Sequence, residues 1–205
     1  MLILTSSNNS VTADFIQHLS KKPSQMKLTF IPTAAEVEEG GLEWLHEDRR
    51  ALVEAGFQVT DFTLTGKTKE AVKNMLESAD FVFVSGGNTF FLLQEMKKSG
   101  FADLIKEYVN KGLIYGGTSA GSIVAGPDIS LTAGLDDLSL APDLKDYTAL
   151  NLTDVVVFPH WGSEHFQRRY EEVMKTGYKK GLKIILLTDD QYLLVDGGKY
   201  SIESI

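Results

Sequence analysis

Short apolar segments alternate with longer stretches of helical periodicity along the chain. The apolar segments are mostly continuous, which is typical of strands buried on both faces of a parallel sheet. They cover residues 2–5, 28–32, 57–64, 81–85, 113–115, 155–158 and 184–187. Because helical stretches separate these strands, the pattern predicts crossover connections and a mostly parallel sheet with helices on both faces.

The helical stretches have recognisable ends. They cover residues 36–55, 69–78, 89–98, 101–111 and 164–180. Glycine follows four of them, at Gly56, Gly100, Gly112 and Gly181, and it is favoured there because it accepts left-handed dihedral angles. Thr68 and Ser163 are candidate N-terminal caps for two of the helices.

Two segments depart from this alternation. Residues 127–153 have little periodicity and are expected to form a hairpin plus loop; long irregular segments of this kind are often functional. Residues 192–202 place Asp196-Gly197-Gly198 between two short apolar runs, which predicts a C-terminal β-hairpin. With no internal repeat and no linker, we expect a single α/β domain over residues 1–205.

Composition narrows the function classes. The chain has 205 residues, a formal net charge of -8 and no cysteine. The negative charge disfavours a nucleic-acid partner, and the lack of cysteine removes disulfides, zinc–thiolate sites and a cysteine nucleophile. Neither a phosphate-binding loop nor a zinc-peptidase motif occurs, so we expect no cofactor and no metal.

The sequence also bears on location. No segment approaches the about 18 apolar residues of a membrane span, and the start resembles a strand rather than a signal peptide. We therefore expect no membrane partner and a cytoplasmic location. Both a monomer and a homodimer are compatible with this composition.

The strongest chemical signal lies in residues 113–122. An apolar strand runs directly into Gly117-Thr118-Ser119-Ala120-Gly121, and a helical pattern follows. A nucleophile on a sharp strand-to-helix turn has a strained backbone, so the residues two positions before and after it must be small. The helix N-terminus would also favour developing negative charge. The pattern predicts Ser119 as a nucleophile; the alternative is a glycine-rich helix start that binds phosphate or only packs tightly.

A histidine follows another apolar strand. His160 comes directly after residues 155–158 and Pro159, where a base for Ser119 can reach the same end of the sheet. His18 and His46 fall in helical patterns and are expected on the surface or in packing contacts. His165, five positions beyond His160, is a candidate for supporting the base or facing the substrate; the alternative is an exposed side chain.

A glycine pair follows the strand at residues 81–85. Such a turn can present backbone N–H groups to an oxyanion, and we predict that the N–H groups of Gly87 and Ala120 do so. Asn88 is a candidate cap for the next helix and a candidate substrate-binding residue. A plain turn that uses glycine only for its dihedral angles explains this segment equally well.

The acid that orients the base has two candidate positions. Asp136 and Asp137 lie in the irregular segment, and Asp189 and Asp190 follow the strand at residues 184–187. A carboxylate on the second imidazole nitrogen fixes the tautomer of the base and stabilises the imidazolium. A strand end is the more rigid position and favours Asp189, but both positions remain candidates.

Together these motifs resemble a known family. The segments Gly86-Gly87-Asn88-Thr89, 117–121 and Pro159-His160, in this order and spacing, are similar to the peptidase E (aspartyl dipeptidase) and cyanophycinase family of serine peptidases. The resemblance spans most of the chain. It implies a parallel, flavodoxin-like sheet between helices, as in class I glutamine amidotransferases. It also implies hydrolysis of short peptides with Ser119 as nucleophile, His160 as base, and Asp136 or Asp189 as third member.

The chain departs from peptidase E in one position that bears on specificity. Peptidase E recognises an N-terminal aspartate through an arginine beyond the catalytic histidine, and Phe166 falls at that position here. Arg168 and Arg169 are the nearby cations, although helical spacing favours a solvated face for at least one. We therefore expect a dipeptidase or exopeptidase without a predicted preference for N-terminal aspartate. The alternatives are an esterase of the α/β-hydrolase type and a non-catalytic module that binds a small ligand at the Ser119 turn.

Overall fold

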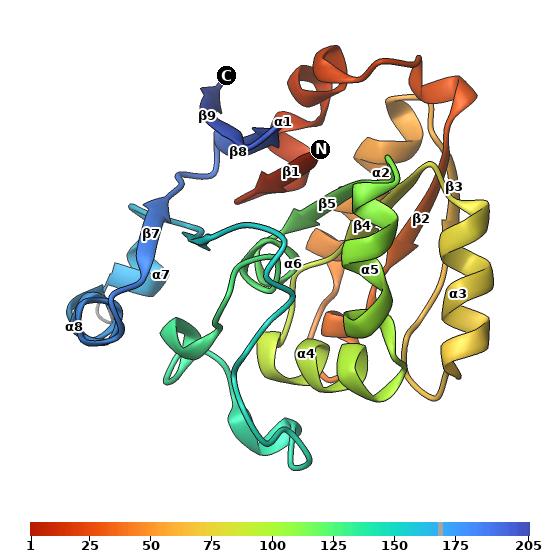
Figure 1. Ribbon diagram of the computed structural model, residues 1–205. Helices are drawn as coiled ribbons and strands as arrows, with labels where there is room; N and C mark the ends of the chain where they lie inside the picture. The colour runs from red at the N-terminus through yellow and green to blue at the C-terminus, as the bar shows by residue number, and fades with distance from the viewer. Residues whose placement is uncertain (168–169) are drawn as a thin grey trace.

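A central sheet carries the strand that leads into Ser119, the candidate nucleophile (Figure 1). The computed structural model describes residues 1–167 and 170–205, and in these ranges the sheet has seven strands in the order β3-β2-β4-β5-β1-β8-β9. They are β1 (Leu2–Thr5), β2 (Lys27–Ile31), β3 (Gln58–Asp61), β4 (Phe81–Val84), β5 (Ile114–Thr118), β8 (Gln191–Asp196) and β9 (Lys199–Ser204).

The sheet is parallel except at one edge. Strands β3, β2, β4, β5 and β1 pair in parallel, whereas β8 pairs antiparallel with β1 and β9 antiparallel with β8. The prediction of a mostly parallel α/β sheet with a C-terminal hairpin is confirmed. Because β1, β4 and β5 run in the same direction, the residues that follow them meet at one edge of the sheet.

Helices cover both faces of this sheet. They are α1 (Asn8–Phe15), α2 (Glu43–Glu54), α3 (Lys69–Ser78), α4 (Thr89–Lys98), α5 (Phe101–Asn110), α6 (Ala120–Ile123), α7 (Glu164–Gln167) and α8 (Tyr170–Lys180). Buried side chains of α1 and α2 share one core cluster, and those of α3, α4 and α5 share the other. None of the helices in the described ranges has the length and apolar character that crossing a membrane requires.

Strand β4 shows why its continuous apolar run was a reliable signal. Its side chains point alternately to the two faces, so Phe81 and Phe83 join the cluster on the α1 and α2 side, and Val82 and Val84 join the other. All four are fully buried. A strand with both faces covered needs apolar residues at every position, and this requirement produces the unbroken pattern.

The described parts of the helix expected over 164–180 are α7 and α8, and residues 168–169 between them lie outside the described residues. Two features differ from the expectation. The helix expected over 36–55 begins only at Glu43, because Gly40, with a φ of 115°, and Gly41 interrupt it. Strands β6 (Val155–Phe158) and β7 (Lys183–Leu186) pair with each other in a separate two-stranded parallel sheet. His160 is therefore carried by an element outside the main sheet.

Candidate active site

Ser119 lies on a strained turn between β5 and α6. Its φ and ψ are 49° and -112°, a backbone conformation that residues other than glycine rarely adopt. The predicted strained strand-to-helix turn is confirmed. Strain of this kind persists only where the surrounding structure holds it, and it is concentrated at functional sites. Helix α6 has only four residues, so its dipole contributes less at Ser119 than the sequence pattern suggested.

The two flanking glycines are required by their surroundings. A Cβ atom on Gly117 would lie 2.4 Å from the carbonyl carbon of Gly121, and one on Gly121 would lie 2.2 Å from the carbonyl oxygen of Val84. Both contacts are with backbone, which cannot move aside without distorting the sheet. The close approach of β4, β5 and α6 therefore explains why glycine stands two residues on either side of Ser119.

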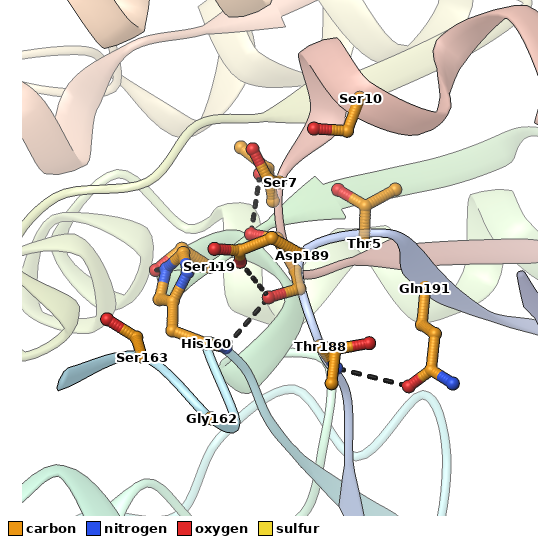
Figure 2. A network of polar contacts seen from close by, with 12 residues as sticks. Thr5, Ser7, Ser10, Ser119, His160, Gly162, Ser163, Thr188, Asp189 and Gln191 are labelled. Atoms are coloured by element: carbon orange, nitrogen blue, oxygen red, sulfur yellow. Dashed lines mark hydrogen bonds and ion pairs between the residues drawn. The ribbon is translucent and has the colours of Figure 1, made fainter. Parts of the chain in front are cut away.

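His160 reaches Ser119 from the separate β6–β7 sheet. Its Nε2 lies 3.1 Å from the Oγ of Ser119 (Figure 2). The backbone at His160 also has a positive φ, of 56°, and its carbonyl oxygen accepts a hydrogen bond from the hydroxyl of Tyr170. The loop after β6 is thus fixed in a conformation that turns the imidazole toward the nucleophile candidate.

Asp189 contacts the other side of the same imidazole. Its Oδ1 lies 2.7 Å from the Nδ1 of His160 (Figure 2). An ionised carboxylate only accepts hydrogen bonds, so Nδ1 carries the proton and Nε2 is left to accept one from the Ser119 hydroxyl. The hydrogen bond with His160 lowers the pKa of Asp189, against the opposing effect of partial burial. The carboxylate therefore stays ionised at neutral pH.

The other candidate acid makes different contacts. The Oδ2 of Asp136 accepts a hydrogen bond of 2.9 Å from the backbone N–H of Thr89, at the start of α4. Asp136 also lines the cleft beside Ser119. Its neighbour Asp137 caps a short 3-10 helix through Ser139, and Asp190 bonds to the hydroxyl of Thr188.

Ser6 joins the network and was not predicted. Its hydroxyl donates to the Oδ1 of Asp189 at 2.8 Å and accepts a hydrogen bond of 2.7 Å from the backbone N–H of His160. It is fully buried and directly follows β1. The signal that could have identified it is the rule used for His160: a polar residue immediately after a buried strand lies at the carboxyl edge of the sheet.

The loop after β4 lies against Ser119. A Cβ atom on Gly86 would lie 3.2 Å from the Cβ of Ser119, and Gly87 lines the same cleft. Gly87 has a φ of 124°, and a Cβ there would lie 2.3 Å from the carbonyl oxygen of Ala34. Only glycine fits this position. Ala120, the first residue of α6, is the other residue predicted to donate its N–H to an oxyanion.

The residues predicted to bind substrate are only partly described by the structure. Asn88 caps α4, as expected, because its Oδ1 accepts from the N–H of Phe91; its Nδ2 donates to the carbonyl oxygen of Asp137. Substrate binding by Asn88 stays a prediction. His165 and Phe166 fall in α7, and their side chains lie outside the described part of the chain. Arg168 and Arg169 lie outside the described residues altogether.

A cleft of about 540 Å³ opens beside Ser119 and His160. Glu38, Asp48 and Asp136 contribute carboxyl groups to its wall, and Trp44 contributes an indole ring. Neither Trp44 nor Asp48 was predicted, because a tryptophan and an acid within a helical pattern read as ordinary packing and solvent-facing positions. Among the described residues, no group of three or more His, Asp or Glu side chains is arranged to hold a metal ion.

Asp48 is the most buried of these carboxyl groups. Only 6% of the residue is exposed, and burial raises the pKa of its side chain to about 7. Its Oδ1 accepts a hydrogen bond of 3.0 Å from the backbone N–H of Asn9, in the first turn of α1. The exposed Glu38 has a pKa raised by partial desolvation and then by the charge of Asp136.

Known peptidases resemble this chain over most of its length. An uncharacterized peptidase of Pasteurella multocida is 34% identical over 183 residues, which are 89% of this chain and 86% of that protein. An uncharacterized peptidase of Listeria innocua is 34% identical over 95% of this chain and 91% of its own length. A peptidase E of Shewanella denitrificans is 32% identical over 73% of this chain and 59% of its own length.

The structural comparison gives the same result. A solved structure from Listeria monocytogenes, assigned as a peptidase E protein, superposes with a TM-score of 0.91 at 30% identity, covering 100% of this chain and 98% of that one. The model of peptidase family S51 matches residues 1–203. With the strained serine, the adjacent histidine and this match, the chain belongs to peptidase family S51, a family of serine peptidases.

Proposed function

We propose that this protein is a serine exopeptidase that hydrolyses short peptides, in particular dipeptides, through an acyl-enzyme on Ser119. The observation that carries the proposal is the continuous chain of contacts from the Oγ of Ser119 through the two nitrogens of His160 to Asp189, in a member of a serine peptidase family. A hydroxyl becomes a useful nucleophile at neutral pH only when an adjacent base takes its proton, and this arrangement supplies one.

In the proposed first step, the Oγ of Ser119 attacks the scissile carbonyl carbon while its proton passes to the Nε2 of His160. The tetrahedral intermediate carries its negative charge on the former carbonyl oxygen, and the N–H groups of Gly87 and Ala120 are proposed to bind that oxygen. When the intermediate collapses, His160 returns the proton to the leaving amine. Water then attacks the ester by the same route in reverse and releases the acyl product with Ser119 regenerated.

Asp189 is proposed as the third member of the triad. Its ionised carboxylate holds the proton of His160 on Nδ1 and stabilises the imidazolium that forms when Nε2 is protonated. Asp136 is the less suitable candidate, because one of its oxygens is engaged by the N–H of Thr89 and its other role is to line the cleft. We propose that Asp136 acts on the substrate side of the cleft rather than on the base.

The size of the cleft supports a short substrate. A volume of about 540 Å³ lies within the range of small-molecule sites and holds a peptide of a few residues. The relatives named peptidase E point in the same direction. An aspartyl side chain, however, would meet the carboxylates of Glu38, Asp48 and Asp136 among the described lining residues. The proposal therefore does not include specificity for N-terminal aspartate, and it needs neither a cofactor nor a metal.

The test is the release of free amino acids from a panel of Xaa-Leu dipeptides, with wild type beside Ser119→Ala. Turnover of some members, reduced by roughly 10³-fold or more in the variant, is the expected result. The identity of the preferred Xaa also tests whether aspartate is selected. Failure of the wild type to cleave any dipeptide in the panel contradicts the exopeptidase assignment.

A further inference from the structure

Asp48 is a buried acid that the proposed reaction does not use. It lies on α2, one helical turn after Trp44, so the two side chains project from the same face of the helix. Both line the cleft that contains Ser119 and His160. Asp48 is thus almost completely buried and still forms part of the wall of this cleft.

This part of α2 lies next to the proposed nucleophile. A Cβ atom on Gly86 would lie 3.2 Å from the Cβ of Ser119 and 3.6 Å from the Cζ3 of Trp44, so the indole and the serine flank the same glycine. The first turn of α1 ties Asp48 to the same region. The N–H of Asn8 donates to the Oγ1 of Thr118, and the next N–H, that of Asn9, donates to Asp48.

The hydrogen bonds of Asp48 leave one of its oxygens unused. Within the described part of the chain, the one hydrogen bond to its side chain is that from Asn9 to Oδ1, and Oδ2 takes none. A buried carboxylate is stable only when it is paired or well hydrogen-bonded. The other carboxyl groups in the wall, on Glu38 and Asp136, add negative potential, and no Lys or Arg is found among the described residues that line the cleft.

From this geometry we infer that Asp48 receives an ammonium group of the peptide substrate and positions the substrate beside Ser119. An ammonium group has three N–H donors, and the Oδ2 of Asp48 can accept a hydrogen bond from one of them. The indole of Trp44, which lines the same cleft, is an aromatic ring of the kind that attracts cations. Two groups of a peptide share this chemistry, the α-ammonium and the side chain of a lysine. The inference rests on the proposed function, since it takes Ser119 as the reacting group.

Contacts in the free protein also give Asp48 a structural role, which the test has to separate. The side chain of Ser7 makes no capping hydrogen bond to α1, and Asp48 satisfies the N–H of Asn9 instead. Asp48→Asn keeps an oxygen for this N–H and removes only the charge. Glu47→Gln is the matched control, because it removes an exposed negative charge from the adjacent position.

The experiment measures second-order rates of Ser119 modification by diphenyl phosphonates, in which the serine oxygen displaces one phenoxide. Three probes are compared: a norleucine analogue with a free α-amine, its N-acetyl derivative, and an N-acetyl-lysine analogue. The ratio of the modification rates of two probes, measured on one protein preparation, does not depend on how much of that preparation is folded. In wild type and Glu47→Gln we expect at least one ammonium probe to react about tenfold faster than N-acetyl-norleucine, and Asp48→Asn to lose this advantage.

The three probes identify the source of the ammonium group. An advantage for the free α-amine probe assigns Asp48 to the substrate N-terminus, and an advantage for the lysine probe assigns it to a basic side chain. Two results overturn the inference but leave the proposed function intact. In the first, an ammonium probe reacts faster than N-acetyl-norleucine by the same factor in Asp48→Asn as in wild type. In the second, wild type reacts at equal rates with all three probes. No modification of Ser119 by any probe contradicts the proposed function, and the inference fails with it.

Discussion

Ser6 and His160 are joined by a hydrogen bond across 154 residues of sequence, from the backbone N–H of His160 to the hydroxyl of Ser6 at 2.7 Å. The same hydroxyl donates to the Oδ1 of Asp189 at 2.8 Å. One buried side chain at the end of β1 therefore fixes the loop that carries the proposed base and the acid that orients it. Because the base comes from the separate β6–β7 sheet, this connection ties that sheet to the main one.

Ser6→Ala tests this positioning role. The variant removes the acceptor of the His160 N–H and one donor to Asp189, so we expect kcat to fall by about 10- to 100-fold with little change in KM. Steady-state kinetics on the preferred dipeptide provide the measurement. Ser10→Ala, which changes an exposed hydroxyl on α1, is the control and should retain wild-type kinetics. An unchanged kcat in Ser6→Ala would show that the network does not position the base.

Paired substitutions distinguish the two candidate acids. Asp189→Asn keeps the shape of the side chain but no longer favours the tautomer with a proton on Nδ1, so we expect kcat to fall by about 10³- to 10⁴-fold. Asp136→Asn retains an oxygen for the N–H of Thr89, and we expect less than about a tenfold loss in kcat, with the larger effect on KM. Measuring both variants under saturating substrate decides the assignment. The opposite ranking would transfer the triad position to Asp136.

The close backbone approach at Gly121 predicts a large loss of stability when a side chain is added there. Gly121→Ala places a Cβ atom 2.2 Å from the carbonyl oxygen of Val84, and we expect a loss of more than about 3 kcal/mol in the free energy of unfolding, or no folded protein. Gly112→Ala is the matched control. Gly112 has a φ of 105° and no atom within 4 Å of the added Cβ, so only the backbone cost of about 1–2 kcal/mol applies. Equal losses in urea unfolding would refute the steric explanation.

Asp48 makes the stability of the protein depend on pH. Burial raises its pKa to about 7 in the folded protein, whereas an aspartate in the unfolded chain titrates near about 4. Between these values the folded state holds the proton more tightly, so this group's contribution to the free energy of unfolding falls as pH rises toward 7. The hydrogen bond from the N–H of Asn9 and the proximity of His160 oppose this rise in the pKa of Asp48, and the charge of Glu47 adds to it.

Asp48→Asn removes this dependence. The free energy of unfolding of the variant minus that of wild type should be about 2.5 kcal/mol larger at pH 8 than at pH 5, because wild type alone has a buried carboxylate at the higher pH. Urea unfolding of both proteins at the two pH values measures the gain. A stability difference that does not change with pH would mean that the Asp48 carboxyl titrates normally.

Sequence patterns predicted the elements whose surroundings restrict the residue type at each position. The strand at β4 was identifiable because both its faces are buried, and the turn at Ser119 because a close backbone approach requires Gly117 and Gly121. The pattern did not predict that β6 and β7 form a separate sheet, since a buried apolar strand has the same signature in either sheet. Pairing partners are set by tertiary packing, which no single segment encodes.

Some residues of the candidate site could likewise be predicted from the sequence, and others could not. Ser119, His160 and Asp189 each follow a strand. His160 and Asp189 lie at the carboxyl ends of two parallel neighbours, β6 and β7, so their proximity could be anticipated from the strand pattern. That this end of the β6–β7 sheet faces Ser119 depends on how the two sheets pack, which the pattern does not encode. Asp48 could not be anticipated, because an acid in an amphipathic helix is normally exposed. Its burial depends on the first turn of α1 packing over it, a long-range contact between residues 9 and 48. Ser6 lies between these cases, since its place after β1 carried a signal.

The nucleophilic role of Ser119 is tested most directly by treating the protein with a fluorophosphonate and locating the adduct by peptide mass spectrometry. Displacement of fluoride by the activated hydroxyl should leave one adduct per chain, on Ser119, and none in Ser119→Ala, which retains Ser6 and every other serine. Absence of an adduct in wild type, or equal modification of Ser119→Ala, would show that Ser119 is not the nucleophile.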